Sequence, residues 1–216
     1  MSDPLELFYA PQSRATGVRV LLEELDAPYN LKIFNLKLGE NRRPDYLAIN
    51  PVGKVPVLRH GEAVVTEQVA IYLYLADLFP EKGLAPALDD PLRGPYLRWF
   101  VYMASCFEPA LIDRAMKREE APQMVSAYGS FDTVMETMRA QLTKGPYVLG
   151  ETVSAVDVCW AMGLRWGMGV GLVPEFDEFK AFTELYFQRP APQFVLQEDR
   201  KLAAEQQDAA EKAGAA

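Results

Sequence analysis

The sequence predicts an α/β domain followed by an all-helical domain, and three features of the 216-residue chain lead to this fold class. Strand-like and helix-like apolar patterns alternate over the first 80 residues. A stretch rich in proline then separates this region from the rest of the chain. Beyond it, apolar residues recur with a helical period. We therefore expect an α/β domain over residues 1–80, a linker over 81–91 and a helical domain over 92–216.

The α/β domain begins with an alternating strand over residues 5–9. An amphipathic helix follows from Ser13, and a second strand covers residues 29–36. A helix between two neighbouring strands allows them to be parallel, with a right-handed crossover. A short helix over 44–47, two short strands and a helix beginning near Thr66 complete the predicted order.

The helical domain contains apolar stripes over 97–107, 131–142 and 179–186, and Pro109 should end or kink the first of them. Ser154 and Asp157 have the spacing of a capping box. The helix that they begin is apolar nearly all round, so we expect it at the centre of the domain. The tail from residue 203 is consistent either with a frayed helix or with disorder.

Composition excludes several classes of protein. Half of the residues are hydrophobic, which is enough for a substantial core. The net charge of −8 argues against a nucleic-acid partner, and no apolar run is long enough to cross a membrane. The start of the chain lacks a signal-peptide pattern. Two cysteines and one histidine predict neither a disulfide framework nor a metal site, so we expect a reduced, cytoplasmic protein.

The stretch over residues 50–70 carries the main functional signal. Pro56 lies inside a short β-run, between Val55 and Val57, although proline cannot donate to a sheet ladder. A cis Val55–Pro56 bond is an economical interpretation. It would leave the backbone N–H and C=O of Val55 free to pair with an extended peptide. The alternative is an ordinary proline at a strand edge.

A helix beginning at Thr66 and Glu67 would complete such a site. Helix N-termini attract carboxylates, because their first N–H groups are free and the dipole is positive there. Glu67 could accept a bond from an ammonium group, and Gln68 adds a neutral amide. These groups together predict a site for a small zwitterionic peptide, although Glu67 alone could be a solvated residue of the first turn.

The segments 50–58 (NPVGKVPVL) and 66–71 (TEQVAI) resemble the glutathione-binding motif of the glutathione transferase superfamily. The resemblance implies a thioredoxin-like N-terminal domain in which Val55, before cis-Pro56, pairs with the cysteinyl backbone of glutathione. It also implies that Glu67 and Gln68 hold the γ-glutamyl end. Gln68 is a departure, because family members most often carry Ser there. The Ser154–Asp157 box also resembles the family's C-terminal domain, and the family implies a homodimer.

Three residues are candidates for activating the glutathione thiol. Ser13 lies where the first helix begins, so its hydroxyl could donate to the thiolate, but Ser is also a favoured N-cap. Tyr9 has the offset at which some classes of the family place a catalytic tyrosine, although an aromatic residue at a strand end usually packs in the core. Arg14 occupies the position at which some bacterial relatives carry a reactive cysteine. It could supply positive potential or simply be solvated.

Other contacts follow from the resemblance. Lys37 and Lys54 are candidates for binding the glycyl carboxylate of glutathione, with a solvated lysine as the alternative for Lys37. The pocket for a small-molecule electrophile would come from the first helical stripe, through Tyr102, Cys106, Phe107 and Ile112. Buried, inert thiols remain the simpler account of both cysteines.

The sequence therefore predicts a glutathione transferase that adds the glutathione thiol to an apolar electrophile, a role in detoxification. Glutathione is expected as co-substrate, without a metal. A glutathione-dependent disulfide reductase or peroxidase on the same fold is the alternative. A non-catalytic relative is a third possibility, but it would be expected to have lost Glu67 or to have gained a bulky residue at Gly53.

Overall fold

The computed structural model describes residues 4–119 and 121–214. Contacts divide the chain into two units. The first contains the chain up to Leu78 together with the segment from Pro190, and the second is Phe79–Arg189.

A mixed four-stranded sheet forms the centre of the first unit, with strand order β2-β1-β3-β4. β1 and β2 are parallel, whereas β3 is antiparallel to both β1 and β4. This arrangement is the one expected for the N-terminal domain. The strands are β1 (Leu5–Tyr9), β2 (Tyr29–Ile33), β3 (Val57–His60) and β4 (Ala63–Val65). β2 is shorter than predicted, because the chain turns into a 3₁₀ helix whose first turn is capped by Asn35.

Helices cover both faces of this sheet. Successive strand residues point to opposite faces, so Phe8 and Tyr9 face different layers. The ring of Phe8 packs against Tyr46 of α2, with 5.6 Å between ring centroids. Tyr9 faces α1 instead. The helical elements up to residue 78 are α1 (Ala15–Glu24), η1 (Leu36–Leu38), η2 (Glu40–Arg42), α2 (Pro44–Leu47) and α3 (Gln68–Leu78).

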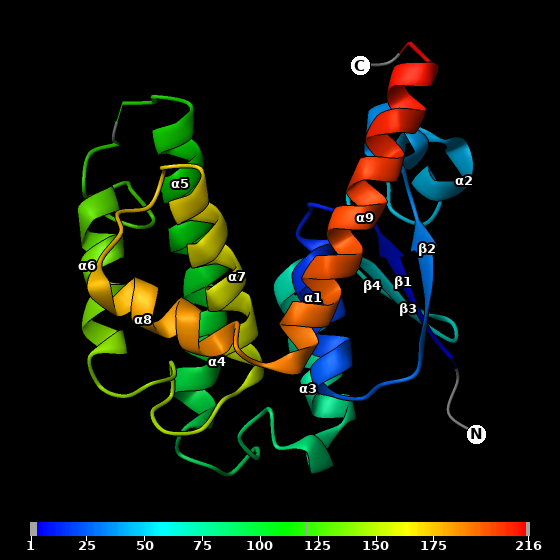
Figure 1. Ribbon diagram of the computed structural model, residues 1–216. Coiled ribbons are helices and arrows are strands. Elements are labelled where there is room, and N and C mark those ends of the chain that lie inside the picture. The colour runs from blue at the N-terminus through cyan, green and yellow to red at the C-terminus, as the bar shows by residue number, and fades with distance from the viewer. Residues whose placement is uncertain (1–3, 120, 215–216) are drawn as a thin grey trace. The chain divides into compact units, whose positions relative to one another are not determined.

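The last helix, α9 (Pro190–Lys212), packs along α1 in the first unit (Figure 1). The predicted helical domain over 92–216 therefore includes a segment that the structure places against the α/β unit. Buried side chains on one face of α9 explain this position, and Gln206 adds reciprocal hydrogen bonds to the chain after β2. Its Nε2 donates to the Phe34 carbonyl (2.9 Å), and its own carbonyl accepts from Asn35 Nδ2 (3.0 Å). The tail is helical as far as Lys212.

α7 is the central helix of the second unit, as expected. Its predicted capping box is present at Ser154 and Asp157. Trp160 is fully buried on α7, and its indole N–H donates to the Trp99 carbonyl (3.1 Å). The helical elements of this unit are η3 (Pro80–Lys82), α4 (Arg93–Tyr102), the π-helical turn η4 (Met103–Phe107), α5 (Glu108–Ala115), α6 (Phe131–Leu142), α7 (Ala155–Gly169) and α8 (Asp177–Tyr186).

The first helical stripe is interrupted near Pro109, as its sequence predicts. α4 ends at Tyr102, one π-helical turn follows, and α5 begins just before Pro109. Proline has no N–H for the regular helical bond, so the wider turn before it accommodates the missing donor.

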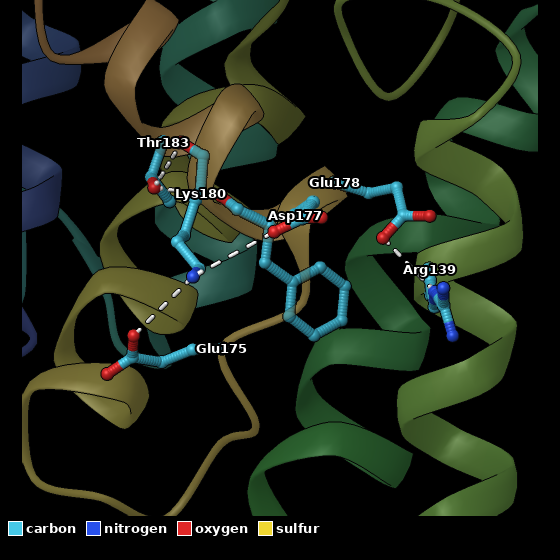
Figure 2. Close-up of polar contacts among 7 residues, drawn as sticks. Arg139, Glu175, Asp177, Glu178, Lys180 and Thr183 are labelled. Atoms are coloured by element: carbon cyan, nitrogen blue, oxygen red, sulfur yellow. Dashed lines mark hydrogen bonds and ion pairs between the residues drawn. The ribbon is translucent and has the colours of Figure 1, made fainter.

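An ion pair joins α6 to α8 in the same unit (Figure 2). Arg139 Nε lies 3.1 Å from Glu178 Oε2. At the start of α8, Lys180 Nζ lies between Glu175 (3.7 Å) and Asp177 (3.9 Å). Across the residues that the structure describes, no helix has both the length and the apolar character needed to span a membrane.

Candidate functional site

The pairing of the strands brings three predicted site segments to the same edge of the sheet, where β1 and β4 end and β3 begins. Phe8 of β1 pairs with Val57, the first residue of β3, so the end of β1 lies beside the start of β3. Val65 at the end of β4 pairs with Leu58. The turn containing Ser13, the loop before β3 and the start of α3 therefore emerge at the same edge.

The loop before β3 contains the cis Val55–Pro56 bond, which confirms the prediction from sequence. Val55 lies outside the strand. Within the described part of the chain, its backbone N–H and C=O have no hydrogen-bond partner. The preceding carbonyl, of Lys54, accepts bonds from the Tyr46 hydroxyl (2.6 Å) and from Asn50 Nδ2 (2.9 Å). These two donors hold the loop while leaving the Val55 backbone open.

Gly53 meets two separate demands in this loop. Its φ of 63° lies in the left-handed region, which side chains disfavour. A Cβ at this position would also lie 2.6 Å from Arg42 Nη1 and 3.0 Å from both the Asn41 carbonyl oxygen and Leu47 Cδ2. The close approach of residues 41–47 to Gly53 appears only in the structure.

The start of α3 lies where the sequence predicts a helix terminus for binding an anion. Glu67 precedes the first residue of α3, and its carbonyl accepts from the Ile71 N–H (3.0 Å). Its φ of 65° is unusual for a residue other than glycine. Such strained conformations cluster at ligand-binding sites. The Glu67 side chain is exposed, and Gln68 is half-buried beside it.

Ser13 is half-buried in the turn between β1 and α1. Its Oγ donates to the Ala10 carbonyl (2.7 Å) and accepts from the Ala15 N–H (3.1 Å). The hydroxyl thus accepts from the N–H of the first residue of α1, although the N-cap residue of this helix is Arg14 and not Ser13. To donate to another acceptor, the Ser13 hydroxyl proton needs only to turn away from the Ala10 carbonyl. Arg14, the next residue, is exposed.

Tyr9 is fully buried, and its hydroxyl donates to the carboxylate of Asp199 on α9. Burial, together with this carboxylate, raises the pKa of Tyr9 above its ordinary value. The Tyr9 hydroxyl therefore makes its hydrogen bond inside the first unit. Sequence reasoning missed Asp199, although its i+4 spacing from the buried Val195 on one helix face was a usable signal.

The two lysines predicted for the glycyl end are both exposed. Lys37 Nζ contacts the side-chain oxygen of Gln207 on α9. Lys54 contributes its carbonyl to the loop described above, and its side chain extends from the same loop.

The residues predicted for the electrophile pocket all lie in the segment from α4 to α5 of the second unit. Phe107 is buried, with its ring centroid 5.0 Å from that of Trp160. Tyr102 and Cys106 are half-buried, and Ile112 is 41% exposed. Phe107 thus contributes to the core, whereas the other three reach the surface. Cys159 is buried, as expected, but Cys106 is not.

Comparison with known proteins identifies the family. A family model described as "Glutathione S-transferase, N-terminal domain" matches residues 3–77. A glutathione S-transferase of Arabidopsis thaliana is 30% identical over 164 residues, covering 69% of this chain and 75% of that protein. The chain belongs to the glutathione transferase superfamily.

Two further relatives of this superfamily member bear on function. A disulfide-bond oxidoreductase of Escherichia coli K12 is 28% identical over 75% of this chain and 80% of its own length. The crystal structure of a glutathione transferase homologue from Sulfitobacter, solved with bound glutathione, is 30% identical. It covers 90% of this chain and 98% of its own, with a TM-score of 0.72. The predicted fold class, a thioredoxin-like α/β domain with an all-α helical domain, is confirmed by this likeness.

Proposed function

We propose that this protein binds glutathione at the sheet edge formed by Ser13, Val55 and Glu67, and adds its thiolate to a small apolar electrophile. The open Val55 backbone before cis-Pro56, beside the N-terminus of α3, carries the proposal. An extended peptide can add to such a backbone segment through main-chain hydrogen bonds. The glutathione bound to the Sulfitobacter homologue supports the choice of peptide.

Each end of glutathione has a matching group. The cysteinyl N–H and C=O pair with the carbonyl and N–H of Val55. The γ-glutamyl ammonium meets the Glu67 carboxylate, and its carboxylate lies over the N-terminus of α3 with Gln68 as a donor. Lys54 and Lys37 supply positive charge for the glycyl carboxylate.

Ser13 activates the thiol in this proposal. A free thiol has a pKa of about 8.5, and only its thiolate is a good nucleophile. The Ser13 proton turns from the Ala10 carbonyl to the sulfur, while Oγ continues to accept from the Ala15 N–H. The thiol proton leaves to solvent, and the N-terminus of α1 stabilises the remaining negative charge. The exposed Arg14 adds positive potential.

The thiolate then attacks the electrophilic carbon, forming a carbon–sulfur bond as a leaving group departs or a double bond accepts the electron pair. Proximity and thiolate stabilisation supply most of the acceleration. Tyr102, Cys106 and Ile112 contact the electrophile, with Phe107 behind them in the core. We also propose a cytoplasmic homodimer.

A disulfide reductase is the second candidate, favoured by the likeness to the E. coli oxidoreductase. Arg14 replaces the cysteine that a protein-thiol mechanism would use at this position. Here the glutathione thiolate itself would attack a substrate disulfide, forming a mixed disulfide and releasing a substrate thiolate. The thiolate of a second glutathione would then attack the mixed disulfide, releasing the remaining half of the substrate as a thiol and forming glutathione disulfide.

The test measures glutathione binding by calorimetry, conjugation of an aryl halide, and reduction of a small disulfide. Wild type, Ser13→Ala and the matched control Ser126→Ala, in a loop of the second unit, are compared. Removing one preorganised donor to a developing anion typically costs about 100-fold or more in rate. We expect that loss of conjugation in Ser13→Ala, near-normal glutathione affinity, and no change in Ser126→Ala. Absence of glutathione binding by the wild type would refute the proposal, and disulfide reduction without conjugation would select the second candidate.

A further inference from the structure

A carboxylate is buried between α9 and α1, next to the turn that carries Ser13. Asp199 of α9 is 4% exposed. It accepts hydrogen bonds from the Tyr9 hydroxyl, from Thr16 Oγ1 (2.8 Å) and from the Gln12 N–H (3.0 Å to Oδ2). A buried charge is tolerated only when such donors surround it, so these contacts hold the three donors in place.

The three donors bracket Ser13 on both sides. Tyr9 ends β1, Gln12 immediately precedes Ser13, and Thr16 lies in the first turn of α1. Gln12 has a φ of 55°, a left-handed conformation that a residue with a side chain adopts only when its surroundings hold it. The bond from the Gln12 N–H to Asp199 is the contact from outside the turn that opposes relaxation of this conformation.

In the described part of the chain the Ser13 hydroxyl bonds only within the turn, to Ala10 and Ala15, and the Ser13 carbonyl accepts from the Thr16 N–H (3.1 Å). The direction of its hydroxyl therefore depends on the path of the backbone around it. Arg19, 6% exposed, adds a positive charge 5.6 Å from the centre of the Tyr9 ring, so the buried carboxylate does not lie in a purely apolar environment.

We propose that Asp199 is a positioning residue for thiol activation, holding the turn over residues 9–16 so that Ser13 faces the sulfur of bound glutathione. This inference rests on the role proposed for Ser13 above. Through Asp199, α9 would thus control the conformation of the turn that carries Ser13.

Both carboxylate oxygens of Asp199 accept hydrogen bonds from the turn. Oδ1 receives the two hydroxyl protons, and both oxygens lie within reach of the Gln12 N–H. In Asp199→Asn the amide can present only one acceptor oxygen. If that oxygen accepts from the Tyr9 and Thr16 hydroxyls, the NH₂ group of the amide points towards the Gln12 N–H, so that two donors face each other. The turn then loses the 3.0 Å bond from the Gln12 N–H to Oδ2 and keeps only the longer one to the remaining oxygen, 3.2 Å, with almost no change in side-chain volume.

α9 also offers a matched control. Gln206 ties the far end of the helix to the chain after β2, and among the described residues it has no hydrogen bond to the Ser13 turn or to a group assigned to glutathione. Gln206→Ala should therefore weaken the docking of α9 while leaving the Asp199 contacts in place.

The experiment compares wild type, Asp199→Asn, Gln206→Ala and Ser13→Ala in the full chain. The readouts are glutathione affinity, the pH dependence of thiolate absorbance of bound glutathione, kcat/KM for an aryl halide, and Tm. For Asp199→Asn we expect a thiol pKa moved towards the free value of about 8.5, kcat/KM lower by about tenfold or more, and glutathione affinity within about threefold of wild type. Gln206→Ala should lower Tm with an unchanged thiol pKa.

A folded Asp199→Asn protein with the thiol pKa and kcat/KM of wild type would overturn the inference, while loss of activity in Ser13→Ala would leave the proposed function intact. If the wild type binds no glutathione, both proposals fall. Should Asp199→Asn fail to fold, Thr16→Val removes one donor and keeps the carboxylate. It should move the thiol pKa in the same direction by a smaller amount, and an unchanged pKa there would also overturn the inference.

Discussion

Replacing Gly53 by alanine tests whether the loop before cis-Pro56 is as tightly determined as the structure indicates. The left-handed conformation costs a residue with a Cβ about 1–2 kcal/mol, partly offset by about 0.4–1 kcal/mol because alanine restricts the unfolded chain. The added Cβ would also lie 3.0 Å from the Asn41 carbonyl oxygen and 3.0 Å from Leu47 Cδ2. Crowding of packed atoms typically costs about 1–3 kcal/mol.

Gly39 separates the two costs. It also has a left-handed φ, 70°, but a Cβ there would meet no described atom within 4 Å. Gly39→Ala should therefore lower the free energy of unfolding by about 1.6 kcal/mol at most, through the backbone alone. Gly53→Ala should lower it by about 1–3 kcal/mol more, measured by chemical denaturation of both variants.

The functional consequence should separate the two variants as well. Gly53 precedes Lys54, whose carbonyl is held by Tyr46 and Asn50, so a displaced residue 53 moves the Val55 backbone. We expect glutathione affinity to fall about tenfold in Gly53→Ala, equivalent to ~1.4 kcal/mol, and to stay unchanged in Gly39→Ala. Equal stability and equal affinity in the two variants would refute the reasoning, because only crowding distinguishes the sites.

Two further predictions concern buried titrating groups. Burial raises the pKa of Tyr29 and Tyr46 to about 12, and it also raises the pKa of Tyr9. In an absorbance titration these phenols should therefore ionise late in the folded protein and near pH 10 after unfolding. Their contribution to stability is complete below pH 10 and is lost as pH rises through about 12. Burial raises the pKa of Asp157 from 3.8 to about 6, so its protonated form favours folding below pH 4 and that contribution is lost as pH rises through about 6. The free energy of unfolding of wild type relative to Asp157→Asn should fall by about 2 kcal/mol between pH 4 and 7, and parallel pH profiles of the two proteins would contradict this.

Much of the candidate site could be predicted because its signals are local. A proline between two valines indicated the cis bond, and a polar helix start after a short strand indicated the terminus at Glu67. The break near Pro109 followed from the missing N–H of proline, although its resolution as a π-helical turn did not. Phe107 shows the limit of this reasoning, because its burial depends on Trp160, 53 positions further along the chain.

The two buried aspartates show why the rest could not be predicted. Asp157 accepts from the Ser154 N–H three residues away (2.7 Å), so a four-residue pattern contains both partners and the capping box was visible in the sequence. Asp199 meets Tyr9 across 190 residues, and no local pattern specifies which carboxylate approaches a given hydroxyl. The choice between Ser13 and Tyr9 depended on this second kind of contact. Because the Tyr9 hydroxyl donates to Asp199 inside the unit, we propose Ser13 as the donor, since its proton can turn away from the Ala10 carbonyl. The segment that decides the proposed chemistry of the first turn is therefore the last helix of the chain.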